Sequence, residues 1–402
     1  MFLHTNDGAP NGRIFRIDLN KPERGAWKEI VAEPKEAVLS GFSLSKSFLA
    51  VTLKRDALNR IELRDFDGKF VRELAQPGIG SAGLGTDRDS DTAYFGFSSF
   101  NVPPSTYKVN LVDDTRALYF RPDYPVVSEN YTVEERFYAS KDGTKIPLFL
   151  VHRKGLKLDA NNPTILYGYG GFSAGQKPGF NPTLLPWLDA GGVYALAGLR
   201  GGDEYGEPWH HAGMLANKQN VFDDCIAAAE FLIREKYTSP AHLGVRGGSN
   251  GGLLTGAVLT QRPDLFTAVG VGVPLLDMLR YDKFLMAKYW VPEYGDPAKA
   301  GDFATLRAYS PYHQVRAGVN YPAVLLEAGE KDARVHPMHA RKMTAALQAA
   351  TSGDPAGRPI LLSVDYDSGH GSGKSFEMRV RDTADTYLFF AKQLGLDFDA
   401  KK

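Results

Sequence analysis

The chain has 402 residues, more than one ordinary domain needs, so two domains are expected. Its 47 Lys and Arg balance 47 Asp and Glu, which argues against a partner such as nucleic acid or an anionic membrane surface. The single cysteine, Cys225, excludes an intrachain disulfide and offers no thiolate cluster for a metal. No apolar run could span a bilayer and the first residues are too polar for a signal peptide, so we expect a soluble, cytoplasmic protein.

The first 125 residues consist of short alternating segments separated by Gly, Asp, Asn and Pro, which predicts an all-β region. A weak repeat runs through them, because IFRIDL, IELRDF and YKVNLV begin at residues 14, 61 and 107. A period in the forties with several strands per repeat is typical of β-propeller blades. An ordinary β-sandwich is the alternative.

This region holds only two to three blades, whereas propellers usually close with four to eight. Met1 also stands directly before a blade-like strand. We therefore expect that the N-terminal part of a longer protein is missing, which would leave an open propeller with an exposed edge. A targeting signal would be lost with it, so a periplasmic or secreted location stays an alternative.

From about residue 128 strands alternate with helical segments, which predicts an α/β fold. The expected domains are therefore a partial β-propeller at residues 1–127 and an α/β domain at residues 128–402. A hairpin is predicted from residues 137–140 and 146–151, and further strands at residues 164–167, 193–197, 243–246, 269–273, 323–328 and 360–364. Helical patterns cover residues 222–234 and 375–394.

The tract GGSNGG at residues 247–252 lies between an apolar strand and a helix of small residues, the context of a nucleophile elbow. Ser249 would sit on a sharp turn that only flanking glycines allow, with the amide of Asn250 facing the oxyanion. A second GxSxG pattern surrounds Ser173, but the Pro and Gly that follow it cannot continue a helix. The context therefore selects Ser249.

In α/β-hydrolases the acid and then the histidine follow the serine along the chain. Among the downstream histidines, His370 alone lies in a Gly-rich loop between the last strand and the last helix, so it is the expected base. Asp332 leaves the penultimate strand and would hold the second nitrogen of His370. Asp277 is the next candidate for the acid, followed by Glu330.

The tract YGYGGF at residues 167–172 follows a core strand where lipases and esterases carry a glycine-rich oxyanion loop. A tyrosine hydroxyl is a good donor to an oxyanion, so Tyr169 is a candidate for the second hydrogen bond beside Asn250. Aromatic packing under a glycine turn is the alternative for this tyrosine.

Together these tracts, with RGGDEYG at residues 200–206 and LANKQN at residues 215–220, resemble the prolyl oligopeptidase family, which joins a β-propeller to an α/β-hydrolase. The likeness covers essentially the whole chain but begins part-way through the family's propeller. It implies a nucleophile at Ser249, an acid at Asp332 and a base at His370, with oxyanion donors at Tyr169 and Asn250.

The resemblance also implies a substrate pocket. Trp290 would stack on the substrate proline, and Arg334 would bind a carbonyl of the preceding substrate residue. The remaining pocket residues implied by the family are Phe172, Tyr294 and Val335. A flat apolar slot suits a pyrrolidine ring, which loses little flexibility on binding. The family often carries a second acid after the catalytic one, where this chain has Ala333.

We therefore expect a serine endopeptidase that cleaves short peptides after proline through an acyl-enzyme, acting as a monomer without a metal or cofactor. One alternative is a peptidase or esterase of the same fold with another specificity. A preference for Lys or Arg would require acidic residues in the pocket, and the aromatic set around Trp290 argues against it. The other alternative is an inactive fragment whose propeller is too incomplete to support catalysis.

Overall fold

The computed structural model describes residues 1–371 and 373–399, and it divides into two compact units. The first unit contains residues 1–133, 177–182 and 203–209. The second contains residues 134–176 and 183–202 and the chain from residue 210 onward.

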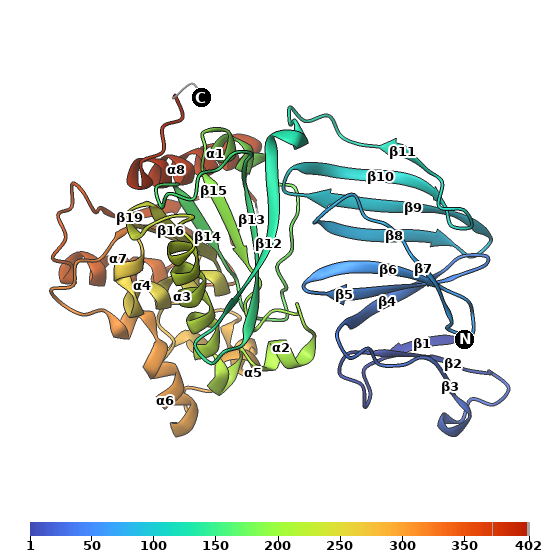
Figure 1. Cartoon of the computed structure of the whole chain (residues 1–402). Coiled ribbons are helices and arrows are strands. Elements are labelled where there is room, and N and C mark those ends of the chain that lie inside the picture. Colours follow the sequence, from blue (N-terminus) through green and yellow to red (C-terminus); the bar gives the residue numbers. More distant parts are fainter. Residues whose placement is uncertain (372, 400–402) are drawn as a thin grey trace. The chain divides into compact units, whose positions relative to one another are not determined.

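The first unit is built from three antiparallel sheets in which each strand pairs with the next one along the chain (Figure 1). The first sheet has three strands, β1 (Phe2–Thr5), β2 (Arg13–Arg16) and β3 (Lys28–Val31). The second has four, β4 (Val38–Leu44), β5 (Leu49–Arg55), β6 (Leu58–Arg64) and β7 (Phe70–Glu73). The third also has four, β8 (Ser81–Asp87), β9 (Ser90–Ser99), β10 (Val102–Asn110) and β11 (Arg116–Phe120).

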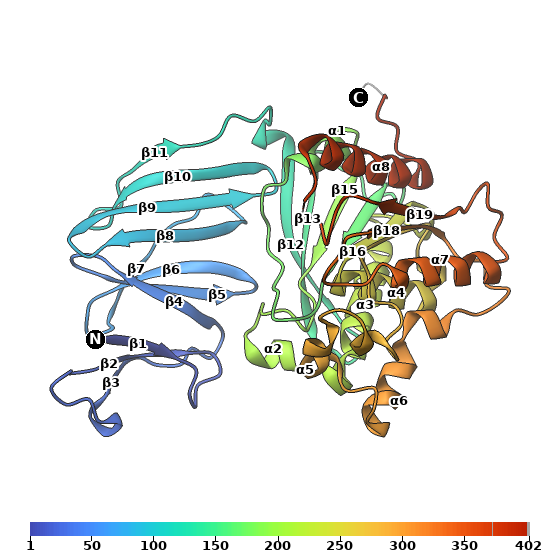
Figure 2. The ribbon, with the colours of Figure 1, turned by 180° about the vertical axis from the view of Figure 1, so that it is seen from behind.

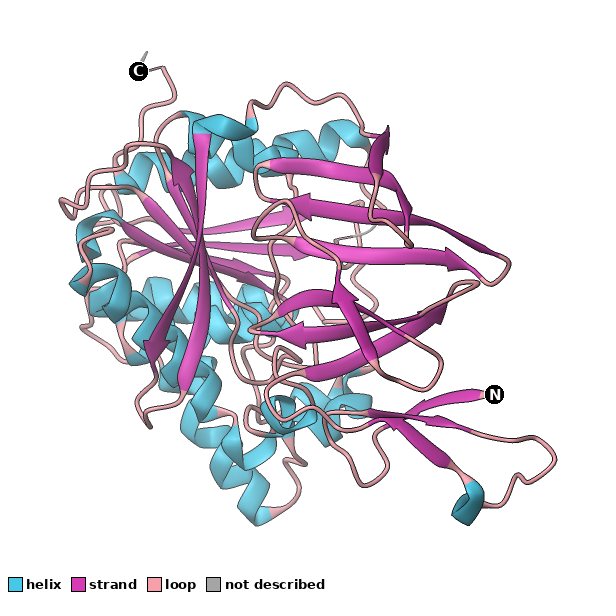
Figure 3. Ribbon diagram, turned by 45° about the vertical axis from the view of Figure 1, so that its right-hand side comes forward, coloured by secondary structure: helices cyan, strands magenta, loops and turns pink. Residues whose placement is uncertain are grey.

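The three sheets pack on one another through apolar side chains. One cluster joins the first two sheets and includes Ile14, Val31, Leu39, Leu49 and Val51. A second cluster joins the second and third sheets and includes Ile61, Leu63, Ala93, Phe95, Phe97 and Val109. Two of the repeated segments occupy equivalent strands. IELRDF begins in β6 and YKVNLV begins in β10, and each of these is the third strand along the chain in its four-stranded sheet. Figure 3 draws the strands of the three sheets in magenta, together with those of the second unit.

Two short segments from later in the sequence belong to the first unit. The hydroxyl of Ser81 donates to the carbonyl of Pro178 over 2.6 Å. Lys54 pairs with Asp203, with 2.5 Å between Nζ and Oδ2. These contacts explain why residues 177–182 and 203–209 group with the sheets rather than with the second unit.

The second unit is organised by one eight-stranded sheet with the order β12-β13-β15-β14-β16-β17-β18-β19. β13 and β15 are antiparallel. The neighbouring strands from β15 through β14, β16, β17 and β18 to β19 are all parallel. The strands are β12 (Tyr131–Ala139), β13 (Lys145–Arg153), β14 (Thr164–Tyr167), β15 (Val193–Ala197), β16 (Leu243–Gly248), β17 (Ala268–Gly272), β18 (Ala323–Gly329) and β19 (Ile360–Asp365). Parallel strands bring their carboxyl ends, and the loops that follow them, to the same edge of the sheet.

Helices cover both faces of this sheet. The helices α1 and α8 lie on one face, and α3 and α4 lie on the other (Figures 1 and 2). Figure 2 shows the unit from behind, with α7 beside β18 and β19. The bounds are α1 (Leu185–Asp189), α2 (Glu207–His211), α3 (Gln219–Arg234), α4 (Asn250–Gln261), α5 (Val291–Tyr294), α6 (Ala300–Tyr309), α7 (Met338–Ala350) and α8 (Phe376–Leu394).

The sequence patterns do not identify α6 and α7. The buried side of α7 is made of Ala340, Met343, Thr344 and Leu347 together with a buried histidine, so its apolar face is weak. The last helix is clearly delimited, since Ser375 accepts a hydrogen bond from the Met378 amide and Gly395 ends the helix at φ 77°. None of the helices within the described residues is long and apolar enough to cross a membrane.

Candidate active site

Ser249 lies on a tight turn between β16 and α4, with φ 59° and ψ −118°. A Cβ on Gly247 would stand 2.3 Å from the carbonyl oxygen of Gly251, and a Cβ on Gly251 would stand 2.8 Å from that of Gly168. Neither position could carry a side chain without moving the backbone. The strained turn therefore depends on the first and last glycines of the GxSxG pattern.

Gly248 is different, because a Cβ there would find its nearest atom at 3.7 Å. Ser173, the serine of the second GxSxG pattern, also has a positive φ of 54°, but it is exposed and no helix follows it directly. The structure thus places Ser249, and not Ser173, at a strand-to-helix turn.

His370 and Asp332 meet in the loops after β19 and β18. The Nδ1 atom of His370 lies 2.6 Å from Oδ2 of Asp332, and the other carboxylate oxygen accepts from the amides of Arg334 and Val335 at 2.8 and 2.9 Å. Burial acts to raise the pKa of Asp332, but the hydrogen bonds from His370 and the two amides outweigh it and hold this pKa below its ordinary value. The carboxyl is therefore ionised at neutral pH.

The other two candidate acids lie in different ion pairs. Asp277 is buried and pairs with Lys342 and with Arg280, whose Nη2 lies 2.8 Å from the carboxylate. Glu330 pairs with Arg341 on the surface. Of the three acids considered, the structure brings only Asp332 to His370.

Tyr169 and Asn250 flank the serine. Burial raises the pKa of Tyr169, so its hydroxyl stays protonated and able to donate at neutral pH. Asn250 is the first residue of α4, where backbone amides point out of the helix. Its side chain donates to the carbonyl of Tyr169 over 2.6 Å, and this bond fixes the two expected donors relative to each other.

The expected pocket residues come from three separate segments. Phe172 is 38% exposed, and its ring centroid lies 6.4 Å from that of Trp290 and 5.6 Å from that of Tyr294, both edge to face. Tyr294 is buried and donates its hydroxyl to the side chain of Asn250 over 2.9 Å. Val335 is buried beside Asp332, whereas Arg334 is exposed.

Sequence analysis missed a buried polar cluster behind the Tyr169 loop. Glu293 accepts from the amide of Phe172 over 3.1 Å, and its second oxygen lies 2.7 Å from Nε2 of His210. Lys218 donates to the carbonyl of Gly170 over 2.8 Å and pairs with Glu293 at 3.5 Å. Lys218 lies in the LANKQN tract, but its sequence neighbours give no sign of Glu293.

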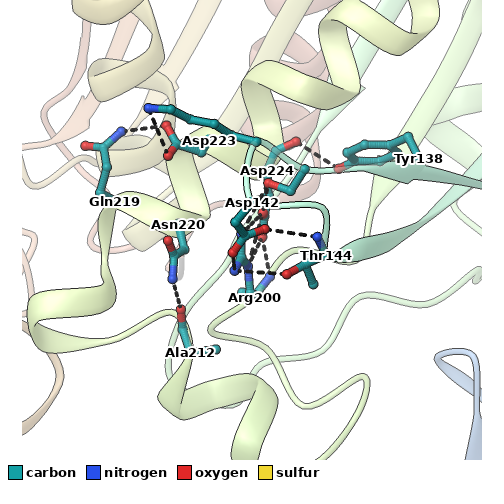
Figure 4. Close-up of polar contacts among 11 residues, drawn as sticks. Tyr138, Asp142, Thr144, Arg200, Ala212, Gln219, Asn220, Asp223 and Asp224 are labelled. Atoms are coloured by element: carbon teal, nitrogen blue, oxygen red, sulfur yellow. Dashed lines mark hydrogen bonds and ion pairs between the residues drawn. The ribbon is translucent and has the colours of Figure 1, made fainter.

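A second buried network supports the turn that follows β15. Arg200 forms a bidentate pair with Asp224 and also contacts Asp142 and the hydroxyls of Ser140 and Thr144 (Figure 4). Both Arg200 and Asp224 are buried. The next residue, Gly201, accepts a hydrogen bond from Ser173 over 3.0 Å, so this network supports the same loop from another side.

Within the part of the chain that the structure describes, no group of three or more His, Cys, Asp or Glu side chains is placed to hold a metal ion.

Comparisons with known proteins agree with this architecture. Residues 178–397 match the model of the prolyl oligopeptidase family, and residues 1–121 match that of the prolyl oligopeptidase N-terminal β-propeller domain. The predicted combination of partial propeller and α/β-hydrolase is thereby confirmed, and the β-sandwich alternative is wrong.

Curated relatives include the prolyl endopeptidases of Elizabethkingia miricola and Dictyostelium discoideum. Each is 39% identical over 98% of this chain, which covers 56% and 54% of their respective lengths. The chain therefore spans about half the length of the curated relatives that it matches.

Solved structures are similar over the same range. One, from a study of two prolyl endopeptidases, is 48% identical with a TM-score of 0.92, over 98% of this chain and 58% of the other. Another, prolyl oligopeptidase B from Galerina marginata bound to a 35mer hydrolysis and macrocyclization substrate, is 32% identical with a TM-score of 0.91, over 98% and 56%. Because the two family models together match residues 1–121 and 178–397, the chain belongs to the prolyl oligopeptidase family, as its sequence tracts predict.

Proposed function

We propose that this chain is a serine endopeptidase that hydrolyses short peptides on the carboxyl side of proline. The observation that carries the proposal is the contact of His370 Nδ1 with Asp332 at 2.6 Å, combined with Ser249 on a strained elbow. Curated relatives are named prolyl endopeptidases, which supports the specificity.

In the proposed mechanism Asp332 holds the proton on Nδ1 of His370, so Nε2 is the nitrogen that accepts the proton of Ser249. The serine oxygen then bonds to the carbonyl carbon after the substrate proline, and the amide of Asn250 and the hydroxyl of Tyr169 donate to the oxyanion. When the carbon–nitrogen bond breaks, the imidazolium gives its proton to the leaving amine. Water, deprotonated by His370, releases the proline carboxylate and regenerates Ser249.

The specificity is assigned to the aromatic pocket. The exposed Phe172 and the half-buried Trp290 offer apolar ring surface, which suits the rigid pyrrolidine of proline, and the buried Tyr294 packs edge to face against Phe172. Arg334 is exposed, and its guanidinium is proposed to donate to a carbonyl of the preceding substrate residue. We further propose that the protein acts as a cytoplasmic monomer.

The test is hydrolysis of a blocked Gly-Pro chromogenic amide and of its arginine counterpart, with Ser249→Ala as the control. We expect release of the chromophore from the proline substrate by the wild type alone, with a burst on the corresponding ester. Equal or faster cleavage after arginine would refute the specificity. A folded wild type that cleaves neither substrate would refute the peptidase function of this chain.

A further inference from the structure

The loop at residues 168–173 has a conformation that its own residues disfavour. Gly170, Phe172 and Ser173 have φ values of 65°, 57° and 54°. Two of these residues carry side chains, for which the left-handed region costs free energy. Because the loop holds Tyr169 and Phe172, contacts elsewhere in the unit must keep it in this conformation.

Two of these contacts are charged and buried. Lys218 Nζ donates to the carbonyl of Gly170 over 2.8 Å, and Glu293 accepts from the amide of Phe172 over 3.1 Å. The two groups therefore hold the main chain on both sides of Gly171. Each comes from a different segment, Lys218 from the residue before α3 and Glu293 from α5.

The pair itself is removed from solvent. Lys218 is 1% exposed and Glu293 is 4% exposed, with 3.5 Å between Nζ and Oε1. Burial lowers the pKa of Lys218 to about 8, against the opposing effect of Glu293. Apolar residues of similar size often stabilise such a site equally well or better, so global stability is a poor explanation for a buried ion pair.

Resting on the proposed function, we propose that Lys218 is a positioning residue that, together with Glu293, holds the Tyr169 loop against the Ser249 elbow, where Asn250 binds the carbonyl of Tyr169, and holds the Phe172 ring at the proline pocket. Lys218 touches neither the substrate nor the serine in this role. It acts through the carbonyl of Gly170 directly and through Glu293 on the amide of Phe172. His210 completes the cluster by binding the second oxygen of Glu293.

The first test measures the loop itself and does not depend on activity. Amide hydrogen exchange of a peptide covering residues 168–173 is compared between the wild type and Lys218→Met. We expect exchange in this peptide to rise by about tenfold or more, because the loop loses one of its anchors. Unchanged exchange in a folded variant would overturn the proposal.

The matched control is Lys342→Met, which removes a lysine from another buried carboxylate, Asp277. It should leave exchange at residues 168–173 unchanged. If Lys218→Met does not fold, the double variant Lys218→Met/Glu293→Gln replaces it, since it leaves no unpaired carboxylate and keeps an acceptor for Phe172. Unchanged exchange in that double variant would also overturn the proposal.

The second test separates positioning from general damage. A peptide ending in proline aldehyde forms an oxyanion on Ser249, whereas the same peptide ending in the proline carboxylate requires the pocket alone. We expect Lys218→Met to weaken aldehyde binding at least about tenfold more than product binding, and to lower kcat on the order of 10²-fold through misplacement of Tyr169. Equal weakening of both ligands would contradict a role in oxyanion positioning.

The two proposals fail in distinguishable ways. An inactive but folded wild type refutes the peptidase function, and the exchange result still decides whether Lys218 anchors the loop. An active wild type whose loop and aldehyde preference are unaffected by Lys218→Met refutes the positioning role alone.

Discussion

The substitution Asp332→Asn gives a sharp test of the proposed triad. The carboxylate of Asp332 has one oxygen on the amides of Arg334 and Val335 and the other on Nδ1 of His370. Asparagine can keep the first oxygen as an acceptor, so the loop geometry should survive. Its amide nitrogen would replace the second oxygen and would donate where the carboxylate accepts.

The expected magnitude follows from this exchange of acceptor for donor. With a donor facing Nδ1, His370 would carry its proton on Nε2 and could no longer accept the proton of Ser249. Loss of the correct tautomer in a serine triad lowers kcat by about 10⁴-fold. At about 1.4 kcal/mol per factor of ten, this corresponds to about 5.5 kcal/mol of transition-state stabilisation.

The assay is pre-steady-state and steady-state hydrolysis of a blocked Gly-Pro chromogenic ester, with circular dichroism to confirm folding. The matched control is Glu330→Gln, which neutralises a nearby carboxylate that pairs with Arg341 on the surface. We expect near wild-type kcat from this control. A folded Asp332→Asn variant that retains kcat within about tenfold of the wild type would refute the assignment of the acid and the tautomer argument.

The same variant has a predictable effect on acid stability. The folded-state pKa of Asp332 lies below its ordinary value, so the ionised carboxyl contributes stability above the unfolded pKa and loses it as the pH falls through the folded pKa. Below about pH 4, the wild type should therefore lose part of its stability advantage over Asp332→Asn. Denaturant unfolding at several pH values measures this, and a difference that does not narrow in acid would contradict the hydrogen bonding of Asp332.

Three further outcomes are expected. Gly247→Ala should lower the free energy of unfolding in urea by about 1–3 kcal/mol, because its Cβ would meet the carbonyl oxygen of Gly251 at 2.3 Å. Gly248→Ala is the control, since its Cβ would find the nearest atom at 3.7 Å and should cause no such loss. Equal losses in the two variants would contradict the steric argument. Trp290→Ala should raise KM for a proline substrate about tenfold or more with a smaller change in kcat, and an unchanged KM would remove Trp290 from the pocket. Cys225 is fully buried and burial raises the pKa of its thiol to about 12, so an aromatic disulfide reagent at pH 8 should label it only in denaturant.

The sequence by itself determined the features that depend on neighbouring residues. The Ser249 elbow includes a local steric requirement, since a Cβ at position 247 would meet the carbonyl oxygen of Gly251 at 2.3 Å. The blade strands follow from alternation of apolar residues, and the parallel strands follow from short buried apolar runs. The order of serine, acid and histidine along the chain restricts the candidate acid and base for Ser249 to a few loops at one edge of a sheet.

The tertiary structure decided what depends on residues far apart in the chain. Sequence order left Asp332, Asp277 and Glu330 as candidate acids, and only the packing of the loops after β18 and β19 brings one of them to His370. No local pattern pairs Lys218 with Glu293, the anchors of the Tyr169 loop, because a buried charge is stabilised by partners that folding supplies. The residues that shape the site are therefore determined by contacts between segments far apart in the sequence, and a local sequence pattern does not predict these contacts.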